Sequence, residues 1–179
     1  MGAVLKRPPL APYDELIIDL GQNDDVVVGD LVYASGNVLL GRVSDVLGQT
    51  SKVTLLSSPG ETYDVLISNG NNTTSISSTG SKTIPAIAHG LGGGQFSVEV
   101  PRDVIASAGD IVLIPSINNK TIGVVGSVVT DPAQPFETIL FTSLTNIYEL
   151  RWVLVDTNTN TAPNPTVTTR VITTKNVKK

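Results

Sequence analysis

Apolar residues in this chain recur in short runs that alternate with polar residues, and clusters of turn-forming residues separate the runs. Such alternation is typical of strands with one buried face, and no stretch sustains the period of an amphipathic helix. The pattern predicts strands at residues 16–20, 30–34, 38–46, 52–57, 64–68, 84–88, 95–100, 111–114, 121–130, 138–141 and 148–155. We therefore expect an all-β protein with two small β-barrel or sandwich domains and little or no helix.

One long break in the apolar pattern suggests a boundary between two domains. Residues 69–82 are Gly, Asn, Ser and Thr with Ile76 and Lys82, so this stretch cannot bury much surface. Three prolines within residues 7–12 favour an extended arm at the start of the chain. The predicted division is an arm at 1–13, a first barrel at 14–75, a second barrel at 76–156 that is allowed to exchange strands with the first, and a flexible, basic Thr/Asn-rich tail at 157–179.

The two halves share an order of motifs that indicates an internal repeat. Gly-Asp precedes an apolar strand in each half, and the strand that follows carries a glycine. Loops absorb the differences in spacing at little entropic cost, although chance agreement between short β patterns is an alternative explanation. The residues expected to shape turns are Gly21, Gly29, Asp30, Gly41, Gly109, Asp110 and Gly123.

Composition narrows the classes of partner. Hydrophobic residues form 40% of the chain but aromatic residues only 4%, so Val, Ile and Leu must supply most of the core. A net charge of -4 provides no field that attracts phosphate, which argues against nucleic acid as a partner. No apolar run reaches the ~18 residues that span a bilayer. The start also lacks a signal peptide, so we expect either a cytoplasmic chain or one whose targeting segment has been removed.

The sequence lacks the parts of a catalytic, cofactor or metal site. It contains no cysteine, and His89 is the sole histidine, without a Gly-x-Ser-x-Gly motif to supply a nucleophile. Residues 90–94 lack the spacing of a phosphate-binding loop. Aspartates at 19, 24, 25 and 30 do not match a calcium loop, and we interpret them as turn caps. Pairs of carboxylates remain open, because their chemistry depends on separation in space.

The ordered motifs resemble the extracytoplasmic region of the MreC family of rod shape-determining proteins. The motifs are Arg7-Pro8-Pro9, Pro12-Tyr13-Asp14, Ile17-Ile18-Asp19-Leu20-Gly21, Val28-Gly29-Asp30, Gly41-Arg42-Val43, Gly92-Gly93-Gly94-Gln95-Phe96, Pro101-Arg102-Asp103-Val104 and Gly109-Asp110-Ile111-Val112. Each is weak alone, and their joint order is the specific feature. The likeness covers about residues 7–156. Asp25 stands where the family usually has glycine, so we expect an aspartate in a left-handed backbone conformation there.

The resemblance implies a non-catalytic scaffold outside the cytoplasmic membrane. Its partners would be a class B penicillin-binding transpeptidase and membrane proteins of the wall-elongation machinery, with self-association as a further option. An N-terminal membrane helix, absent from this sequence, would anchor it, and no cofactor is implied. We expect partners to contact apolar strand edges and the segment 88–96, through Leu91, Gln95 and Phe96.

Two other functions are compatible with the pattern. The Thr/Asn-rich linker and tail suit a surface adhesin or extracellular β module. A degenerate barrel hydrolase would need a serine and an acid beside His89.

Overall fold

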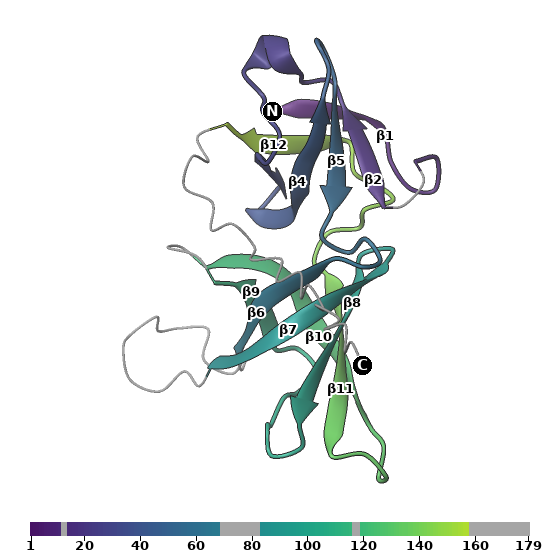
Figure 1. The fold of residues 1–179 in the computed structure, drawn as a ribbon, viewed down its shortest axis with the longest axis vertical. Helices are drawn as coiled ribbons and strands as arrows, with labels where there is room; N and C mark the ends of the chain where they lie inside the picture. Colours follow the sequence, from purple (N-terminus) through teal and green to yellow (C-terminus); the bar gives the residue numbers. More distant parts are fainter. Residues whose placement is uncertain (12–13, 69–82, 116–118, 158–179) are drawn as a thin grey trace, which may run out of the picture.

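The computed structural model describes residues 1–11, 14–68, 83–115 and 119–157. Twelve strands in this part of the chain form two closed barrels, which confirms the predicted all-β class. The first contains β1 (Gly2–Lys6), β2 (Glu15–Ile18), β3 (Leu31–Ala34), β4 (Val38–Val46), β5 (Ser51–Leu55) and β12 (Trp152–Asp156). The second contains β6 (Thr62–Ser68), β7 (Thr83–Gly92), β8 (Gln95–Pro101), β9 (Ile111–Ile114), β10 (Lys120–Thr130) and β11 (Phe136–Ser143). The barrels lie end to end along the long axis of the molecule (Figure 1).

The barrels have the same strand order, and the second is inserted into the first. Pairing runs β1-β12-β3-β4-β5-β2 around one barrel and β7-β6-β9-β10-β11-β8 around the other. β12 therefore occupies in the first barrel the place that β6 occupies in the second. Since β12 follows β11 in sequence, the chain leaves the first barrel after β5, completes the second, and returns to close the first.

This topology differs from the predicted domain boundaries at three places. Residues 2–6, assigned to an arm, form β1 and pair with β2 and β12. β6 belongs to the second barrel, because it pairs with β7 and β9. β12 belongs to the first, because it pairs with β1 and β3. Alternation locates a strand but does not specify its partner, which explains these differences. The predicted boundary loop and most of the predicted tail lie outside the described residues.

The predicted repeat is visible as the same turn in both barrels. Asp30 Oδ2 accepts the Val27 N–H at 2.9 Å, and Asp110 Oδ2 accepts the Ser107 N–H at 2.8 Å. Both aspartates are buried, at 2% and 5% exposure. A glycine with positive φ precedes each aspartate, Gly29 with 101° and Gly109 with 96°. The N–H of each glycine donates at 2.8 Å to a strand carbonyl, Val43 O in β4 and Val125 O in β10 respectively. The Gly-Asp pairs therefore fix the entry of β3 and β9.

Two glycines expected in turns lie instead inside strands. Gly41 is in β4 and Gly123 is in β10. A Cβ at either position would come within 3.0 Å of the neighbouring strand's backbone, at Thr54 and Thr142 respectively. Both glycines permit a close approach of backbones where the barrel strands cross, which is a packing requirement rather than a turn. Gly21 begins the only helical turn of the described chain, η1 (Gln22–Asp24), and Asp25 ends it with φ 60°, the left-handed conformation expected there.

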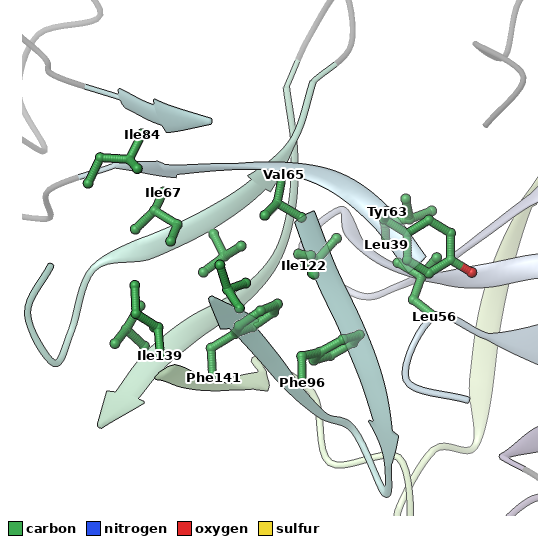
Figure 2. Packing of buried hydrophobic residues seen from close by; sticks show 14 of the residues in the cluster. Leu39, Leu56, Tyr63, Val65, Ile67, Ile84, Phe96, Ile122, Ile139 and Phe141 are labelled. Atoms are coloured by element: carbon green, nitrogen blue, oxygen red, sulfur yellow. The ribbon is translucent and has the colours of Figure 1, made fainter. Parts of the chain in front are cut away.

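The core of the second barrel extends into the first. Phe96 and Phe141 stack at its centre with ring centroids 4.6 Å apart (Figure 2). Three buried side chains of the first barrel, Tyr33, Leu39 and Leu56, belong to the same apolar cluster. The two barrels are thus joined by shared hydrophobic burial as well as by the chain.

Candidate functional site

The glycine-rich stretch at residues 90–94 includes a tight turn built into the junction between the barrels. Gly92, Gly93 and Gly94 have positive φ values of 94°, 65° and 76°. The Gly92 N–H donates to Ser57 O at 2.7 Å, and the Gly93 N–H donates to Asp14 Oδ2 at 2.6 Å. The turn between β7 and β8 is therefore held by the first barrel and is not a free loop.

Asp14 is the central residue of this junction. Its carboxylate accepts from the Ser57 hydroxyl at 2.8 Å in addition to Gly93, and its carbonyl accepts from the Leu55 N–H at 3.0 Å. The residue adopts φ 52°, a conformation that Asp tolerates better than most side chains. A single aspartate thus connects β2 and β5 of one barrel to the β7–β8 turn of the other.

A groove of about 250 Å³ lies beside this turn, on the outer face of the second barrel. Its lining consists of Leu91, Gln95, Phe96, Gly126, Ser127, Leu140, Phe141 and Thr142. Pairing brings three strands together here, since Gln95 faces Thr142 and Ser127 faces Leu140. The register of β10 shifts between Val125 and Ser127, and Gly126 at the shift has no side chain, which hollows the surface.

The apolar surface continues from the groove along the same face. Alternate residues of a strand share a face, so Phe136 lies on the side of β11 that carries Leu140. Val129 of β10 faces Thr138, between these two positions. The exposed fractions are 49% for Leu91, 36% for Leu140, 52% for Val129 and 51% for Phe136. We call these four residues the apolar stripe.

The structure separates the three residues predicted to contact a partner. Leu91 and Gln95 are exposed at the rim of the groove. Phe96 is 2% exposed and stacks on Phe141, so the expectation that its ring contacts a partner is wrong. Because side chains alternate along β8, Phe96 must face inward when Gln95 faces outward. The alternation within the predicted strand 95–100 already carries this information.

The expectation that partners contact apolar strand edges also needs correction, because the barrels leave few edges open. Both barrels are closed, so a row of unpaired backbone groups is not available along an entire strand of either barrel. Sequence reasoning also missed Leu140 and Gly126. The glycine inside an apolar strand was a usable signal, because such glycines often mark a bulge.

Two of the aspartates considered as metal ligands accept hydrogen bonds from backbone N–H groups instead. Asp24 Oδ2 accepts the Gly21 N–H at 3.0 Å, and Asp19 Oδ1 accepts the Ala3 N–H at 2.5 Å. His89 lies exposed in β7, between Thr62 and Ser97 on the neighbouring strands. Within the described ranges no group of three or more His, Cys, Asp or Glu could hold a metal ion.

Tyr63 belongs to a hydrogen-bonded polar network with Glu61 and Arg42. The Tyr63 hydroxyl donates to Glu61 Oε2 at 2.6 Å, and Arg42 pairs with the same oxygen at 3.0 Å. Burial, and then the hydrogen bond to Glu61, raise the pKa of Tyr63 above its usual 10.0. This network lies where the chain passes from the first barrel to the second. A further depression of about 440 Å³ over β6 and β7 contains Asp64 but no second acid in its lining.

None of the helical segments seen in the described chain has the length and apolar character needed to cross a bilayer.

Comparisons with known proteins identify the architecture. The family model described as "Rod shape-determining protein MreC, barrel core" matches residues 4–157. The solved structure of MreC from Pseudomonas aeruginosa is 23% identical with a TM-score of 0.70, covering 87% of this chain and 96% of that one. MreC from Listeria monocytogenes is 21% identical with a TM-score of 0.65, and the match covers 86% of this chain and 72% of that one. A chain in the complex between penicillin-binding protein PBP2 and MreC from Helicobacter pylori is 13% identical with a TM-score of 0.56. That match covers 87% of this chain and 94% of the other. No curated protein sequence matches the chain.

Proposed function

The chain belongs to the MreC family of rod shape-determining proteins, and we propose that it is a non-catalytic scaffold of the cell-wall elongation machinery. It acts by presenting docking surfaces on two rigidly joined barrels. Family membership supports a role in determining cell shape. The side chains that carry chemistry in other proteins cap turns or lie apart in this one, which supports a function without catalysis.

The partner that we propose is a class B penicillin-binding transpeptidase, together with membrane proteins of the same machinery. A relative from Helicobacter pylori has been solved as a complex with the penicillin-binding protein PBP2, and that complex supports this assignment. The proposal places the barrels outside the cytoplasmic membrane. There an N-terminal membrane helix beyond this sequence would anchor them, and self-association would add to the assembly.

The observation that carries the docking proposal is the groove with the adjoining apolar stripe. Leu91 and Leu140 are both substantially exposed although they line the same concave surface. Exposed apolar side chains that gather around a hollow are typical of protein contact sites, whereas scattered ones are not. The polar rim, Gln95 and Thr142, supplies groups that can fix the orientation of a bound chain.

A binding titration with the purified extracytoplasmic part of the transpeptidase tests the site. We expect the double variant Leu91→Ser and Leu140→Ser to raise Kd by about tenfold or more, because central apolar contacts carry most interface energy. Ile105→Ser is the matched control, since Ile105 is 78% exposed and does not line the groove. Equal affinity for the double variant and the control would remove the groove from the proposal.

A further inference from the structure

The rim of the groove on the second barrel is held from outside that barrel. Leu91 lines the groove, and the register of β7 against β8 shifts between Gly90 and Gly92, on either side of it. Pairing within the sheet therefore does not fix Leu91 by itself. The Gly90 N–H donates to Glu61 O at 3.0 Å, and the Gly92 N–H donates to Ser57 O at 2.7 Å. Both acceptors lie in the connection from β5 to β6, so the position of Leu91 depends on the junction between the barrels.

Asp14 supplies the contact between the first barrel itself and this turn. Its Oδ2 accepts the Gly93 N–H at 2.6 Å and the Ser57 hydroxyl at 2.8 Å. One oxygen therefore connects the turn to the same segment that holds Gly92. Asp14 comes directly before β2, and its carbonyl accepts the N–H of Leu55 at the end of β5. The arrangement of β2 and β5 is thus linked to the turn through a single carboxylate.

Glycine allows the turn to lie close to both connections between the barrels. A Cβ on Gly90 would come within 3.0 Å of the Ser57 carbonyl oxygen, and one on Gly93 would lie 2.8 Å from the Tyr148 hydroxyl. Tyr148 belongs to the connection from β11 to β12, and its carbonyl accepts from Arg7 Nε at 2.7 Å. The turn between β7 and β8 therefore lies between the two segments that join the barrels.

Asp14 does not line the groove, so it can influence docking only through residues that do. We propose that Asp14 is a positioning residue for docking. It holds the β7–β8 turn so that Leu91 stays at the rim, and the first barrel thereby sets the affinity of a surface on the second. Side chains that are ordered before binding lose less conformational freedom on binding, which favours affinity. The inference rests on the proposed function, because it takes the groove as the docking site.

Hydrogen exchange of the free protein, read by NMR, tests the first step without a partner. The test variant is Asp14→Gly, because glycine tolerates the φ of 52° at this position. The acceptors of the Gly90 and Gly92 amides remain in this variant, so their exchange reports loosening of the turn itself. We expect both amides to exchange about tenfold faster. Asp24→Ala is the matched control and should leave both rates unchanged, since Asp24 accepts the Gly21 N–H within the first barrel.

A binding titration with the purified extracytoplasmic part of the transpeptidase tests the second step. We expect Asp14→Gly to raise Kd about fivefold, and to raise it much less when Leu91→Ser is already present. This non-additivity is expected of a residue that acts through Leu91, whereas a loss of folded protein would lower the number of binding sites instead. Asp14→Asn keeps an oxygen acceptor for the Gly93 N–H and should restore most of the affinity.

Ser57→Ala is a milder variant of the same contact. It removes the hydroxyl that donates to Asp14 Oδ2 and leaves the Gly93 N–H in place. We expect it to change the exchange rates and Kd in the same direction as Asp14→Gly, by smaller factors. It carries both tests if Asp14→Gly does not fold.

Two results would overturn the inference. Unchanged exchange at Gly90 and Gly92 would show that the turn does not depend on the Asp14 carboxylate. Additive effects of Asp14→Gly and Leu91→Ser on Kd would show that Asp14 does not act through the groove. Failure of the proposed function gives a different result, because Leu91→Ser with Leu140→Ser then leaves Kd unchanged. That result removes the docking role of Asp14 as well, even if Asp14→Gly loosens the turn.

Discussion

At the scale of single residues, the junction between the barrels depends on Asp14. Its carboxylate holds the Ser57 hydroxyl and the Gly93 N–H, at 2.8 and 2.6 Å, and no other acid contacts the β7–β8 turn in the hydrogen bonds of the described chain. We expect Asp14→Ala to lower the free energy of unfolding by about 2–3 kcal/mol, because two charge-assisted hydrogen bonds are lost. Urea denaturation measures the effect.

Asp64→Ala is the control for Asp14→Ala. Asp64 is exposed on β6, so its replacement should change stability by less than about 0.5 kcal/mol. Equal effects of the two substitutions would show that the Asp14 hydrogen bonds do not stabilise the junction.

Tyr63 should make stability fall at alkaline pH. Burial and the hydrogen bond to Glu61 raise the pKa of Tyr63, so the folded protein keeps the phenol proton that the unfolded chain loses near pH 10.0. The stabilisation is complete below this pH and decreases as the pH rises above it. Between about pH 9 and 11, the urea midpoint should therefore fall less in Tyr63→Phe than in the original chain. Parallel pH profiles would contradict this assignment.

Individual residues could be predicted from sequence where local backbone chemistry determines them. The aspartate caps and the left-handed Asp25 followed from the few conformations that turns allow. Asp14 could not be predicted, because its partners Ser57 and Gly93 are distant in sequence and only the packing of two barrels brings them together.

At the scale of elements, two glycines in β10 have different roles. A Cβ on Gly123 would come within 3.0 Å of the Thr142 backbone, whereas one on Gly126 would meet Leu140 O at an ordinary 3.7 Å. Gly123→Ala should therefore cost about 2–3 kcal/mol, because the strands must separate. Gly126→Ala should cost less than about 1 kcal/mol. Thermal unfolding distinguishes the two, and an equal loss of Tm would contradict the close approach at Gly123.

The sequence predicted the positions of the strands better than it predicted which strands pair. Nearly every strand was located because alternation is a local property of the sequence. β1 was missed because its five residues precede a run of prolines, which suggested an arm. The return of β12 to the first barrel is a long-range pairing that no local pattern encodes.

At the scale of the whole molecule, shared burial should make the two barrels unfold together. Leu39 and Leu56 of the first barrel are each 4% exposed within the core cluster of the second. We expect one calorimetric transition in the original chain. Replacing both leucines by Ala removes about 3 kcal/mol each and should split the transition into two. Two transitions in the original chain would show that the barrels are independent.

The family could be anticipated from the order of weak motifs, and the match over residues 4–157 confirms it. The groove and the apolar stripe could not be anticipated, because they combine β7, β8, β10 and β11 through a register shift that only the fold creates. Membership of this family favours a shape-determining scaffold over the adhesin and hydrolase alternatives.

Photo-crosslinking is the most direct test of the claim that the second barrel docks a transpeptidase. A benzoylphenylalanine at Gln95 would stand at the rim of the groove, and one at Leu10, 81% exposed on the first barrel, would serve as control. The account predicts a covalent product with the purified transpeptidase from position 95 and none from position 10. Equal products from both positions, or a product from position 10 alone, would contradict it.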